Sequence, residues 1–569
     1  MCGVYGISYN DRKIVEQMIK ECGHRGPDGQ NIYNDNKVTI GHNLLSITDS
    51  PTNSLQPWQL PNGNVLSYNG EIFNYHELCH KYKNSFTPRT NCDTEILAWG
   101  LDKFGHKFID EIDSMHAFVF YNKSKQELML STDHLAIKPL YYATQNENII
   151  FSSEIKNMLP HVKYSNTISK EGMACYQWCG MNILDQTLFN KIKRLIPGET
   201  ITYDLYNKKI KNKIYCRIIP KSNNKFSASE FRQQVRKTVK MTSIGIRDFG
   251  IFLSGGLDSS IIAYEMNKIN SKTKTFTNRF KTTDEKIDRG YNSDANVAKL
   301  LAEQENFNHT EVLITPETLT SYWQKCVESN EECNLNPNNF VYWYTNYFMK
   351  QNGVTITLAG DMGDELLTGY NKHFQFVSKY KIKNADQFMG FFNTLNSASP
   401  FHIDPLYFPV SSIIKKKFKK FYVEPLWNDE DPLGSYMAIE CLTSVPYEFL
   451  RRNDKFGMAN SIEGRFPFTT KSFMNYCFSI HSSEKFNLET GELKLPSKLA
   501  YADILPKEML TKVKTGWTAP FGHWLDTHKS PKLFFQIPWN KKYGRGLKFY
   551  KKLFRKWIFK DWKRQHNIV

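Results

Sequence analysis

The chain has 569 residues, of which 40% are hydrophobic, and a formal net charge of +17. Its length allows more than one domain, and its apolar content excludes wholesale disorder. No apolar run approaches the roughly 20 residues of a membrane helix, and the start lacks the pattern of a secretory signal, so we expect a cytosolic protein. The positive charge leaves nucleic acid, an anionic membrane or anionic small molecules as partners.

Residues 1–212 predict a strand-rich domain. Short apolar or alternating runs such as Val65–Tyr68 and Ala117–Tyr121 recur and are separated by turn signals. Helical patterns lie between them, notably Thr94–Phe104. The polar, lysine-rich stretch Pro220–Phe226 predicts a linker to a second domain.

Beyond the linker the pattern changes to strands that alternate with helices. Phe249–Leu253 predicts a short buried strand, and a helix follows from about Asp258 to Ile269. Val354–Leu358 predicts another apolar strand. Alternation of this kind indicates a parallel α/β sheet. After about Phe374 the pattern is mostly helical.

Cys2 is the first residue whose position indicates chemistry. Its small side chain permits removal of Met1, which would leave Cys2 with both a thiol and an α-amine. An α-amine has an ordinary pKa of about 7.7–8.0, so it can act as the base for the neighbouring nucleophile. N-terminal nucleophile hydrolases work in this way.

Several motifs follow Cys2 along the chain. They are His24-Arg25-Gly26-Pro27-Asp28-Gly29, Asn69-Gly70-Glu71-Ile72-Phe73-Asn74, Asp93-Thr94-Glu95, Asp133-His134, Lys138-Pro139-Leu140-Tyr141 and Phe151-Ser152-Ser153-Glu154-Ile155-Lys156. In this order they closely resemble the glutaminase domain of the glutamine-hydrolysing asparagine synthetase family. The resemblance covers most of residues 1–204 and implies an α+β N-terminal nucleophile domain, an αββα sandwich.

The resemblance also implies roles for five residues. Cys2 would attack the side-chain amide of glutamine. Asn69 and the backbone N–H of Gly70 would form the oxyanion hole, since such donors stabilise the negative charge of a tetrahedral intermediate. Glu71 and Asp93 would hold the α-amino group of glutamine. An ordinary turn is the alternative for Asn69-Gly70.

Leu44 departs from the family pattern. It occupies the position of an arginine that clamps the α-carboxylate of glutamine, in the run His42-Asn43-Leu44-Leu45-Ser46-Ile47. A leucine cannot replace a bidentate guanidinium. Either another cation takes over, with Arg25 and Arg89 as candidates, or glutamine binds weakly.

A glycine- and serine-rich loop follows the strand at Phe249–Leu253. Its glycines let backbone amides approach an anion, and the helix behind it presents unpaired N–H groups. The sequence differs from a P-loop and resembles the pyrophosphate-binding loop of ATP pyrophosphatases, which split ATP into AMP and pyrophosphate. The resemblance assigns ATP or pyrophosphate binding to Leu253, Ser254, Gly255, Gly256, Asp258, Ser259 and Ser260.

A second loop after Val354–Leu358 supports this interpretation. It reads Ala359-Gly360-Asp361-Met362-Gly363-Asp364-Glu365 and resembles the corresponding synthetase motif. The resemblance implies that Ala359 and Gly360 contact ATP and that Asp258 and Asp364 bind Mg²⁺. Asp361 stands where the family has a glutamate that acts near the incoming ammonia. The aspartate is one methylene shorter, which changes its reach.

Two further stretches extend the resemblance. Arg452–Lys455 and Met458–Phe468 resemble another synthetase signature. Lys494 fits a lysine placed over pyrophosphate, judged by its spacing to Leu505-Pro506. The similarity therefore reaches from the first strand of the second domain far into its helical part.

Together these features predict a glutamine amidotransferase domain at 1–212 and a synthetase domain at 213–569. The second is an α/β parallel-sheet ATP-pyrophosphatase domain with a helical C-terminal part. The resemblance implies amidation of aspartate to asparagine, with ATP and Mg²⁺ as cofactors and with ammonia from glutamine that passes between the sites. It also implies a homodimer. Another carboxylate acceptor, such as a sugar uronic acid, is the alternative.

Two basic runs suggest a different function. One is Lys415–Lys420, and the other covers Lys548–Arg564 with interleaved aromatic residues. They fit a nucleic-acid surface with stacking side chains, which would make the chain a non-catalytic basic binding protein. The spacing of the apolar residues in the second run also fits an amphipathic helix, and we favour that interpretation. We expect small-molecule substrates instead of nucleic acid or membrane, because the residues of both catalytic sites are retained.

Overall fold

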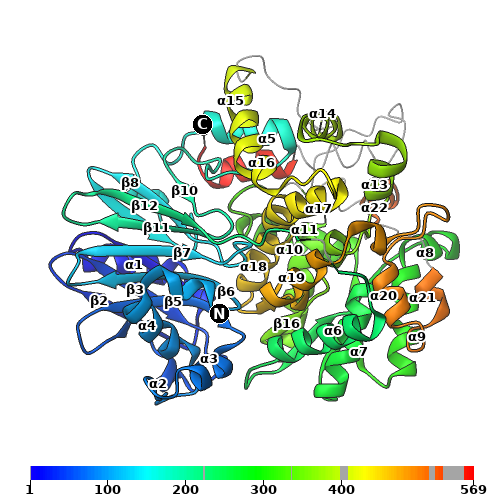
Figure 1. Ribbon diagram of the computed structural model, residues 1–569, viewed down its shortest axis with the longest axis horizontal. Helices are drawn as coiled ribbons and strands as arrows, with labels where there is room; N and C mark the ends of the chain where they lie inside the picture. The colour runs from blue at the N-terminus through cyan, green and yellow to red at the C-terminus, as the bar shows by residue number, and fades with distance from the viewer. Residues whose placement is uncertain are drawn as a thin grey trace.

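The computed structural model describes residues 2–221, 224–334, 336, 338–396, 408–511, 519–528 and 557–568. Figure 1 shows a strand-rich N-terminal half beside a largely helical C-terminal half. Within the described ranges, no helix combines the length and apolar character that a membrane crossing requires.

The N-terminal half is built on two six-stranded antiparallel sheets. The first has the order β10 (Lys193–Arg194), β8 (Tyr141–Gln145), β9 (Asn148–Ser152), β1 (Gly3–Ile7), β3 (Thr39–Leu44), β2 (Gly29–Asn34). The second has the order β12 (Lys209–Tyr215), β11 (Glu199–Asp204), β7 (Glu127–Thr132), β6 (Ser114–Asn122), β5 (Val65–Ile72), β4 (Trp58–Gln59). β1 and β5, which carry the predicted glutaminase residues, lie inside these sheets and not at their edges.

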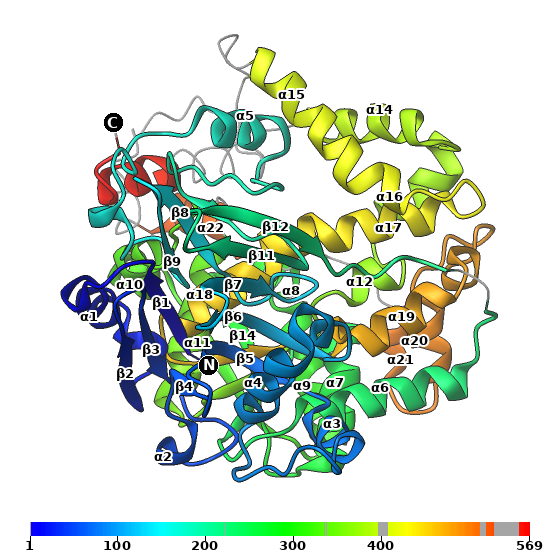
Figure 2. The same ribbon diagram turned by 60° about the vertical axis from the view of Figure 1, so that its left-hand side comes forward.

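Alternation along the strands explains the layers. Val4 of β1 and Val65 of β5 point between the sheets into a shared apolar core. Tyr5 points the other way, toward α1 (Arg12–Glu21). Leu66 faces α3 (Tyr75–Lys81) and α4 (Asp93–Phe104) on the outer side of the second sheet. The result is helix, sheet, sheet, helix, the αββα sandwich that the sequence predicted (Figure 2).

Four helices complete the N-terminal half. They are α2 (Pro51–Ser54), α3 (Tyr75–Lys81), α4 (Asp93–Phe104) and α5 (Lys170–Cys179). α3 and α4 pack on the outer side of the second sheet. α5 instead packs on the C-terminal half, where the indole N–H of Trp178 donates to the side-chain oxygen of Asn393 at 2.9 Å. The two halves are therefore joined by side-chain packing as well as by the chain.

The C-terminal half contains one five-stranded parallel sheet. Its order is β15 (Asn308–Ile314), β14 (Lys274–Phe280), β13 (Phe249–Phe252), β16 (Ile356–Leu358), β17 (Glu463–Arg465). The central strand β13 is buried on both faces, as a parallel strand requires. Its carboxyl end and that of β16 lie side by side, which brings the two predicted loops together.

Helices cover both faces of this sheet. One face packs on α6 (Ala228–Thr242), α7 (Leu257–Ile269) and α9 (Ser293–Gln304). The other packs on α10 (Pro316–Glu328) and α11 (Asn339–Gln351). α8 (Glu285–Tyr291) precedes α9. The predicted α/β architecture is confirmed.

The remainder is mostly helical within the described residues, as predicted. Its helices are α12 (Gly363–Leu366), α13 (Asn371–Gln375), α14 (Ala385–Asn396), α15 (Phe408–Phe418), α16 (Glu424–Leu426), α17 (Pro432–Leu442), α18 (Arg451–Met458), α19 (Lys471–Ser479), α20 (Leu495–Ala500), α21 (Lys507–Thr511) and α22 (Phe521–Thr527). Residues 557–565 form a further helix. The exception is β17, which returns the chain to the sheet edge.

One expectation needs correction. The strand predicted at Val354–Leu358 begins only at Ile356. In the described part of the predicted linker, the N–H of Asn224 donates to the carbonyl oxygen of Ser479 at 2.8 Å, and Asn224 forms a β-bridge with Ile480.

Candidate active sites

A tight loop joins β13 to α7. Gly255 has φ of +71°, and a Cβ there would lie 2.1 Å from the carbonyl oxygen of Asp294, so the position requires glycine. The Ser254 N–H donates to Ser259 Oγ at 3.1 Å, and the two serine hydroxyls are 2.9 Å apart. α7 begins at Leu257, and the described structure gives it no side-chain cap. The N–H groups of its first turn can therefore bind an anion.

The second loop carries α12 up against α7. Gly363 lies so close to Asp258 that a Cβ would approach the carboxyl carbon to 2.4 Å. Met362, just before it, has a left-handed backbone with φ of +80°. This close approach places Asp364 beside Asp258, as the motif resemblance implies for a shared metal.

Lys494 links these two carboxylates. Its ammonium contacts Asp258 Oδ2 and lies 2.5 Å from Asp364 Oδ1. Burial by itself would lower the pKa of Lys494, but the two carboxylates outweigh it and the pKa is raised, so the side chain stays charged. The three predicted residues therefore meet at one point.

The same carboxylates fit a divalent cation. Asp258 and Asp364 already converge on one positive atom, and carboxylate oxygens are the ligands that Mg²⁺ prefers. Among the described residues, no group of three or more His, Cys, Asp or Glu side chains could hold a metal. Further ligands for Mg²⁺ would be phosphate oxygens and water, as is usual for this ion.

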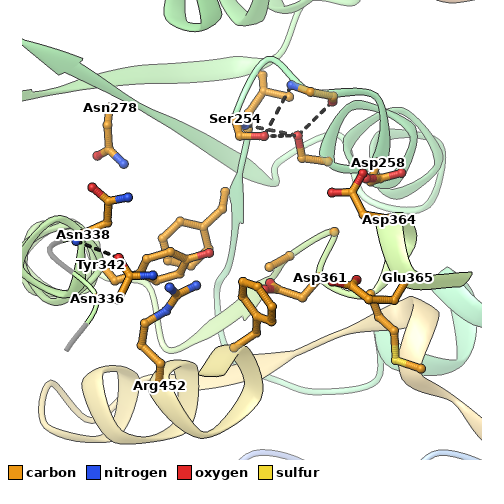
Figure 3. Close-up of a pocket in the computed structure, with 18 of the residues that line it drawn as sticks. Ser254, Asp258, Asn278, Asn336, Asn338, Tyr342, Asp361, Asp364, Glu365 and Arg452 are labelled. Atoms are coloured by element: carbon orange, nitrogen blue, oxygen red, sulfur yellow. Dashed lines mark hydrogen bonds between the residues drawn. The ribbon is translucent and has the colours of Figure 1, made fainter. Parts of the chain in front are cut away.

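A cavity of about 330 Å³ opens in front of the two loops (Figure 3). Most of the residues predicted to bind ATP or ammonia line it, namely Leu253, Ser254, Gly256, Asp258, Ser259, Ala359, Gly360, Asp361 and Asp364. Gly255, Ser260 and Lys494 do not line it. Gly255 shapes the loop backbone, Ser260 is fully buried in α7, and Lys494 lies behind the two carboxylates.

Two acidic side chains of this cavity hold protons more tightly than usual. Burial raises the pKa of Asp361, although Arg452 and a hydrogen bond from Asn453 act in the opposite direction. Burial and the nearby Asp364 raise the pKa of Glu365 to about 8. Glu365 can therefore exchange a proton near neutral pH.

Cys2 lies in the other half, at the start of β1. It is 6% exposed, and its backbone nitrogen donates to Asn69 Oδ1 at 2.9 Å. Asn69 Nδ2 is buried and has no hydrogen-bond partner among the described residues, so this donor is available for an oxyanion. Gly70 follows in the middle of β5, where a Cβ would lie 2.1 Å from the carbonyl oxygen of Met115. Asn69-Gly70 is therefore part of a strand, and the alternative of a turn is wrong.

The two predicted glutamine-binding carboxylates are buried beside each other. Asp93 Oδ2 accepts from the Tyr68 hydroxyl and from the N–H of Ile72, both at 2.8 Å, yet burial raises its pKa to about 6. Glu71 Oε2 accepts from Arg465 Nη2 at 2.9 Å. Glu71 Oε1 is buried without a hydrogen-bond partner among the described residues. Arg465 comes from β17 of the other half, so both halves build this site.

Arg25 and Arg89, the two candidates to replace the missing arginine, are both already paired with carboxylates. Arg25 is bound through Nη1 to Glu154 at 3.0 Å and to Asp454 at 3.1 Å. Arg89 pairs with Glu95 at 2.7 Å, and its side chain is 72% exposed. Leu44 itself is 2% exposed. Arg465 is the cation that contacts the predicted glutamine-binding residue Glu71.

Arg25 also connects Cys2 to the C-terminal half. Its Nε donates to the carbonyl oxygen of Cys2 at 3.1 Å, while its Nη1 binds Asp454 of α18. Lys138 Nζ lies 3.8 Å from the same aspartate. The side chain of Arg25 thus links Asp454 of α18 to the backbone of Cys2.

Two arginines were missed as functional candidates, namely Arg452 and Arg465. Each lies in a motif that was recognised as family-like, but only the fold shows that each is buried. The available signal was charge within an apolar run, as in Ile462-Glu463-Gly464-Arg465-Phe466. A buried arginine needs a partner, and the partner cannot be read from the chain.

The structure describes residues 557–568 of the basic C-terminus. Residues 557–565 form a helix in which Trp562 is fully buried and donates from its indole nitrogen to the carbonyl oxygen of Glu331 at 2.8 Å. The Trp323 indole nitrogen in turn donates to Asp561 at 3.1 Å. Residues 548–556 of this basic run lie outside the described residues. In the described part, aromatic residues anchor an amphipathic helix and are not displayed for stacking on bases.

Comparison with known proteins agrees with this geometry. The family model described as a glutamine amidotransferase domain matches residues 1–216, and the model described as asparagine synthase matches residues 230–564. Asparagine synthetase (glutamine-hydrolyzing) 1 of Bacillus subtilis (strain 168) is 26% identical over 92% of this chain and 88% of its own length. Asparagine synthetase B (glutamine-hydrolyzing) of Escherichia coli (strain K12) is 27% identical over 46% of this chain and 44% of its own length.

A solved structure titled as the allosteric regulatory enzyme of purine biosynthesis shares 16% identity and a TM-score of 0.30, over 48% of this chain and 64% of its own. The asparagine synthase model spans more than half of the chain, and it ends beyond both loops and Lys494. The chain belongs to the asparagine synthase family.

Proposed function

We propose that the protein converts aspartate to asparagine with ATP, using ammonia released from glutamine. The observation that carries this proposal is the meeting of Asp258, Asp364 and Lys494 behind a loop suited to phosphate. The same chain holds Cys2 against Asn69 in its other half. A glutaminase and an ATP-cleaving site in one chain fit an amidotransferase, and the names of its relatives favour aspartate as the acceptor.

We assign residues 1–212 to the glutaminase domain and 213–569 to the synthetase domain. In the first, the Cys2 sulfur attacks the amide carbon of glutamine, ammonia leaves, and water hydrolyses the thioester to glutamate. After removal of Met1, the α-amine of Cys2 takes the thiol proton. Asn69 Nδ2 and the Gly70 N–H donate to the developing oxyanion. Glu71 and Asp93 hold the ammonium group of glutamine.

In the synthetase domain, an acceptor carboxylate oxygen attacks the α-phosphorus of ATP, and pyrophosphate leaves. The loop at Ser254 and the first turn of α7 bind the phosphates. Lys494 offsets the charge of the departing pyrophosphate. Mg²⁺ held by Asp258 and Asp364 would neutralise phosphate charge.

Ammonia then attacks the acyl-adenylate, and AMP leaves. The proton lost by the attacking nitrogen needs an acceptor close to the acyl carbon. Asp361 lines the cavity and has a raised pKa, so it is the residue placed to take that proton.

The test supplies purified protein with ATP, Mg²⁺ and aspartate, and with either glutamine or ammonium. AMP, asparagine and glutamate are followed by mass spectrometry. Asparagine from both nitrogen donors is the expected result. Asparagine from ammonium alone would mean that Leu44 has impaired glutamine binding. No AMP and no asparagine with either donor would rule out aspartate and direct the search to other carboxylates, such as uronic acids.

A further inference from the structure

Arg452 projects from α18 into the synthetase cavity. It is 6% exposed, and its guanidinium carbon lies 4.0 Å from the ring centre of Tyr342 and 5.4 Å from that of Phe449. The two rings hold the planar group in place without neutralising it. Of the described residues that line this cavity, Arg452 is the only one with a positive charge.

The charge of Arg452 lacks a salt bridge. No ion pair between described residues includes Arg452, and its Nε is buried without a hydrogen-bond partner in that part of the chain. Its neighbours on α18 differ, since Arg451 pairs with Glu332 and Lys455 with Glu331. Arg452 hydrogen-bonds Tyr342 and attracts Asp361 across the cavity without forming an ion pair with it. A buried guanidinium that no carboxylate contacts is costly, which points to an anionic ligand at this position.

An anion at Arg452 would lie in a different part of the cavity from the phosphates. Figure 3 shows Asp258 and Asp364 on one side of the cavity and Arg452 with Asn336 and Asn338 on the other. The phosphates belong with the loop and with the metal-binding carboxylates. An anion at Arg452 therefore comes from the second substrate.

The position of α18 supports the same conclusion. Asp454, two residues after Arg452, binds Arg25, which holds the carbonyl oxygen of Cys2. α18 thus separates the two sites and presents Arg452 to the cavity from the side of the glutaminase. Ammonia that arrives from that side would meet an acceptor held near Arg452.

We propose that Arg452 binds the acceptor carboxylate that is not adenylated, and so selects a dicarboxylic acceptor. The proposal rests on the proposed function, in which this group is the α-carboxylate of aspartate. The guanidinium fork suits a carboxylate, and the rings of Tyr342 and Phe449 keep it in one orientation. Arg452 is a specificity residue, because it touches the substrate away from the reacting carbon.

The test combines substrate truncation with substitution. Wild type, R452M, R452K and the surface control R289M (a side chain 79% exposed) are assayed for AMP formation with ammonium. The acceptors are aspartate, succinate, which lacks the amine, and 3-aminopropanoate, which lacks the α-carboxylate. We expect R452M to lower kcat/KM for aspartate and succinate by about 10- to 100-fold, mainly through KM. Activity with 3-aminopropanoate and the KM for ATP should change less than about twofold.

R452K should recover part of the loss, because it keeps the charge but not the fork. Glutaminase activity and circular dichroism show that each variant is folded. An equal loss with 3-aminopropanoate, or a matching rise in the KM for ATP, would overturn the proposal and assign Arg452 to the nucleotide.

A separate outcome concerns the proposed function alone. If the wild type forms no AMP with aspartate, that function fails. Whether Arg452 binds the acceptor carboxylate is then tested by a binding measurement. Radiolabelled succinate is dialysed against wild type and R452M with Mg²⁺ and a non-hydrolysable ATP analogue. Succinate binding that is present in wild type and lost in R452M supports carboxylate binding by Arg452. Equal binding, or none to wild type, refutes it.

Discussion

Arg465 Nη2 lies 2.9 Å from Glu71 Oε2, so a buried ion pair joins the synthetase sheet to the predicted glutamine site. The same guanidinium holds Glu463 through Nε at 2.6 Å and donates from Nη1 to the carbonyl oxygen of Thr242 at 2.9 Å. Because both carboxylates are buried, removal of the arginine takes a charged partner from each of them, which is costly.

We therefore expect R465M to lower the free energy of unfolding by about 3–5 kcal/mol and to reduce glutamine-dependent more than ammonium-dependent synthesis. Urea denaturation and assays with the two nitrogen donors measure these effects. E71Q is the matched control, since it leaves Arg465 paired with Glu463 and should cost less stability. A cost below about 1 kcal/mol for R465M would show that the pair is not important for stability.

Cys2→Ala should abolish glutamate formation from glutamine, with a loss of at least about 10³-fold, because the nucleophile is absent. Asparagine formation from ammonium should persist, since the synthetase cavity is untouched. Cys79→Ala, at a half-buried cysteine outside both sites, is the control. Equal loss of both activities in C2A would indicate that Cys2 acts through structure.

Lys494→Met should lower AMP formation by at least about 100-fold, because the developing charge of pyrophosphate loses a cation. The substitution also leaves Asp258 and Asp364 close together without their shared ammonium. Stopped assays for AMP report the effect, with glutaminase activity as the control for folding. Retention of more than about a tenth of the activity would remove Lys494 from the proposed site.

Gly363→Ala tests the close approach of the two loops. The added methyl group would lie 2.4 Å from the carboxyl carbon of Asp258, so it should displace that side chain and reduce AMP formation. Gly290→Ala adds the same group where no atom lies within 4 Å and should leave the rate unchanged. If both variants keep the wild-type rate, the position of Asp258 is not critical.

Glu440 predicts an acid-sensitive contribution to stability. Burial alone would raise its pKa, but Lys372 and His373 outweigh burial and lower it to about 2. A lowered carboxyl pKa stabilises the fold above the unfolded pKa of 4.5, and the contribution is lost as pH falls from about 4.5 toward 2. We expect E440Q to cost about 3 kcal/mol near pH 6 and almost nothing near pH 2. Urea denaturation at both values checks this, and a constant difference would contradict the pairing.

The sequence alone determined the order and type of the domains. Alternating runs predicted the strand-rich half, and the strand–loop–helix at Phe249–Ile269 predicted the parallel sheet, because local periodicity reports which faces are buried. The motifs around Cys2, Ser254 and Asp361 predicted the two sites, since local backbone and side-chain requirements are written in contiguous residues.

Only the tertiary structure decided how distant charges combine. Lys494 lies 130 residues beyond Asp364, yet its ammonium sits between Asp364 and Asp258. Arg465 pairs with Glu71, Arg25 pairs with Asp454, and Arg452 lines the synthetase cavity. Such pairings depend on how sheets and helices pack in three dimensions, and no spacing along the chain encodes which buried charge meets which.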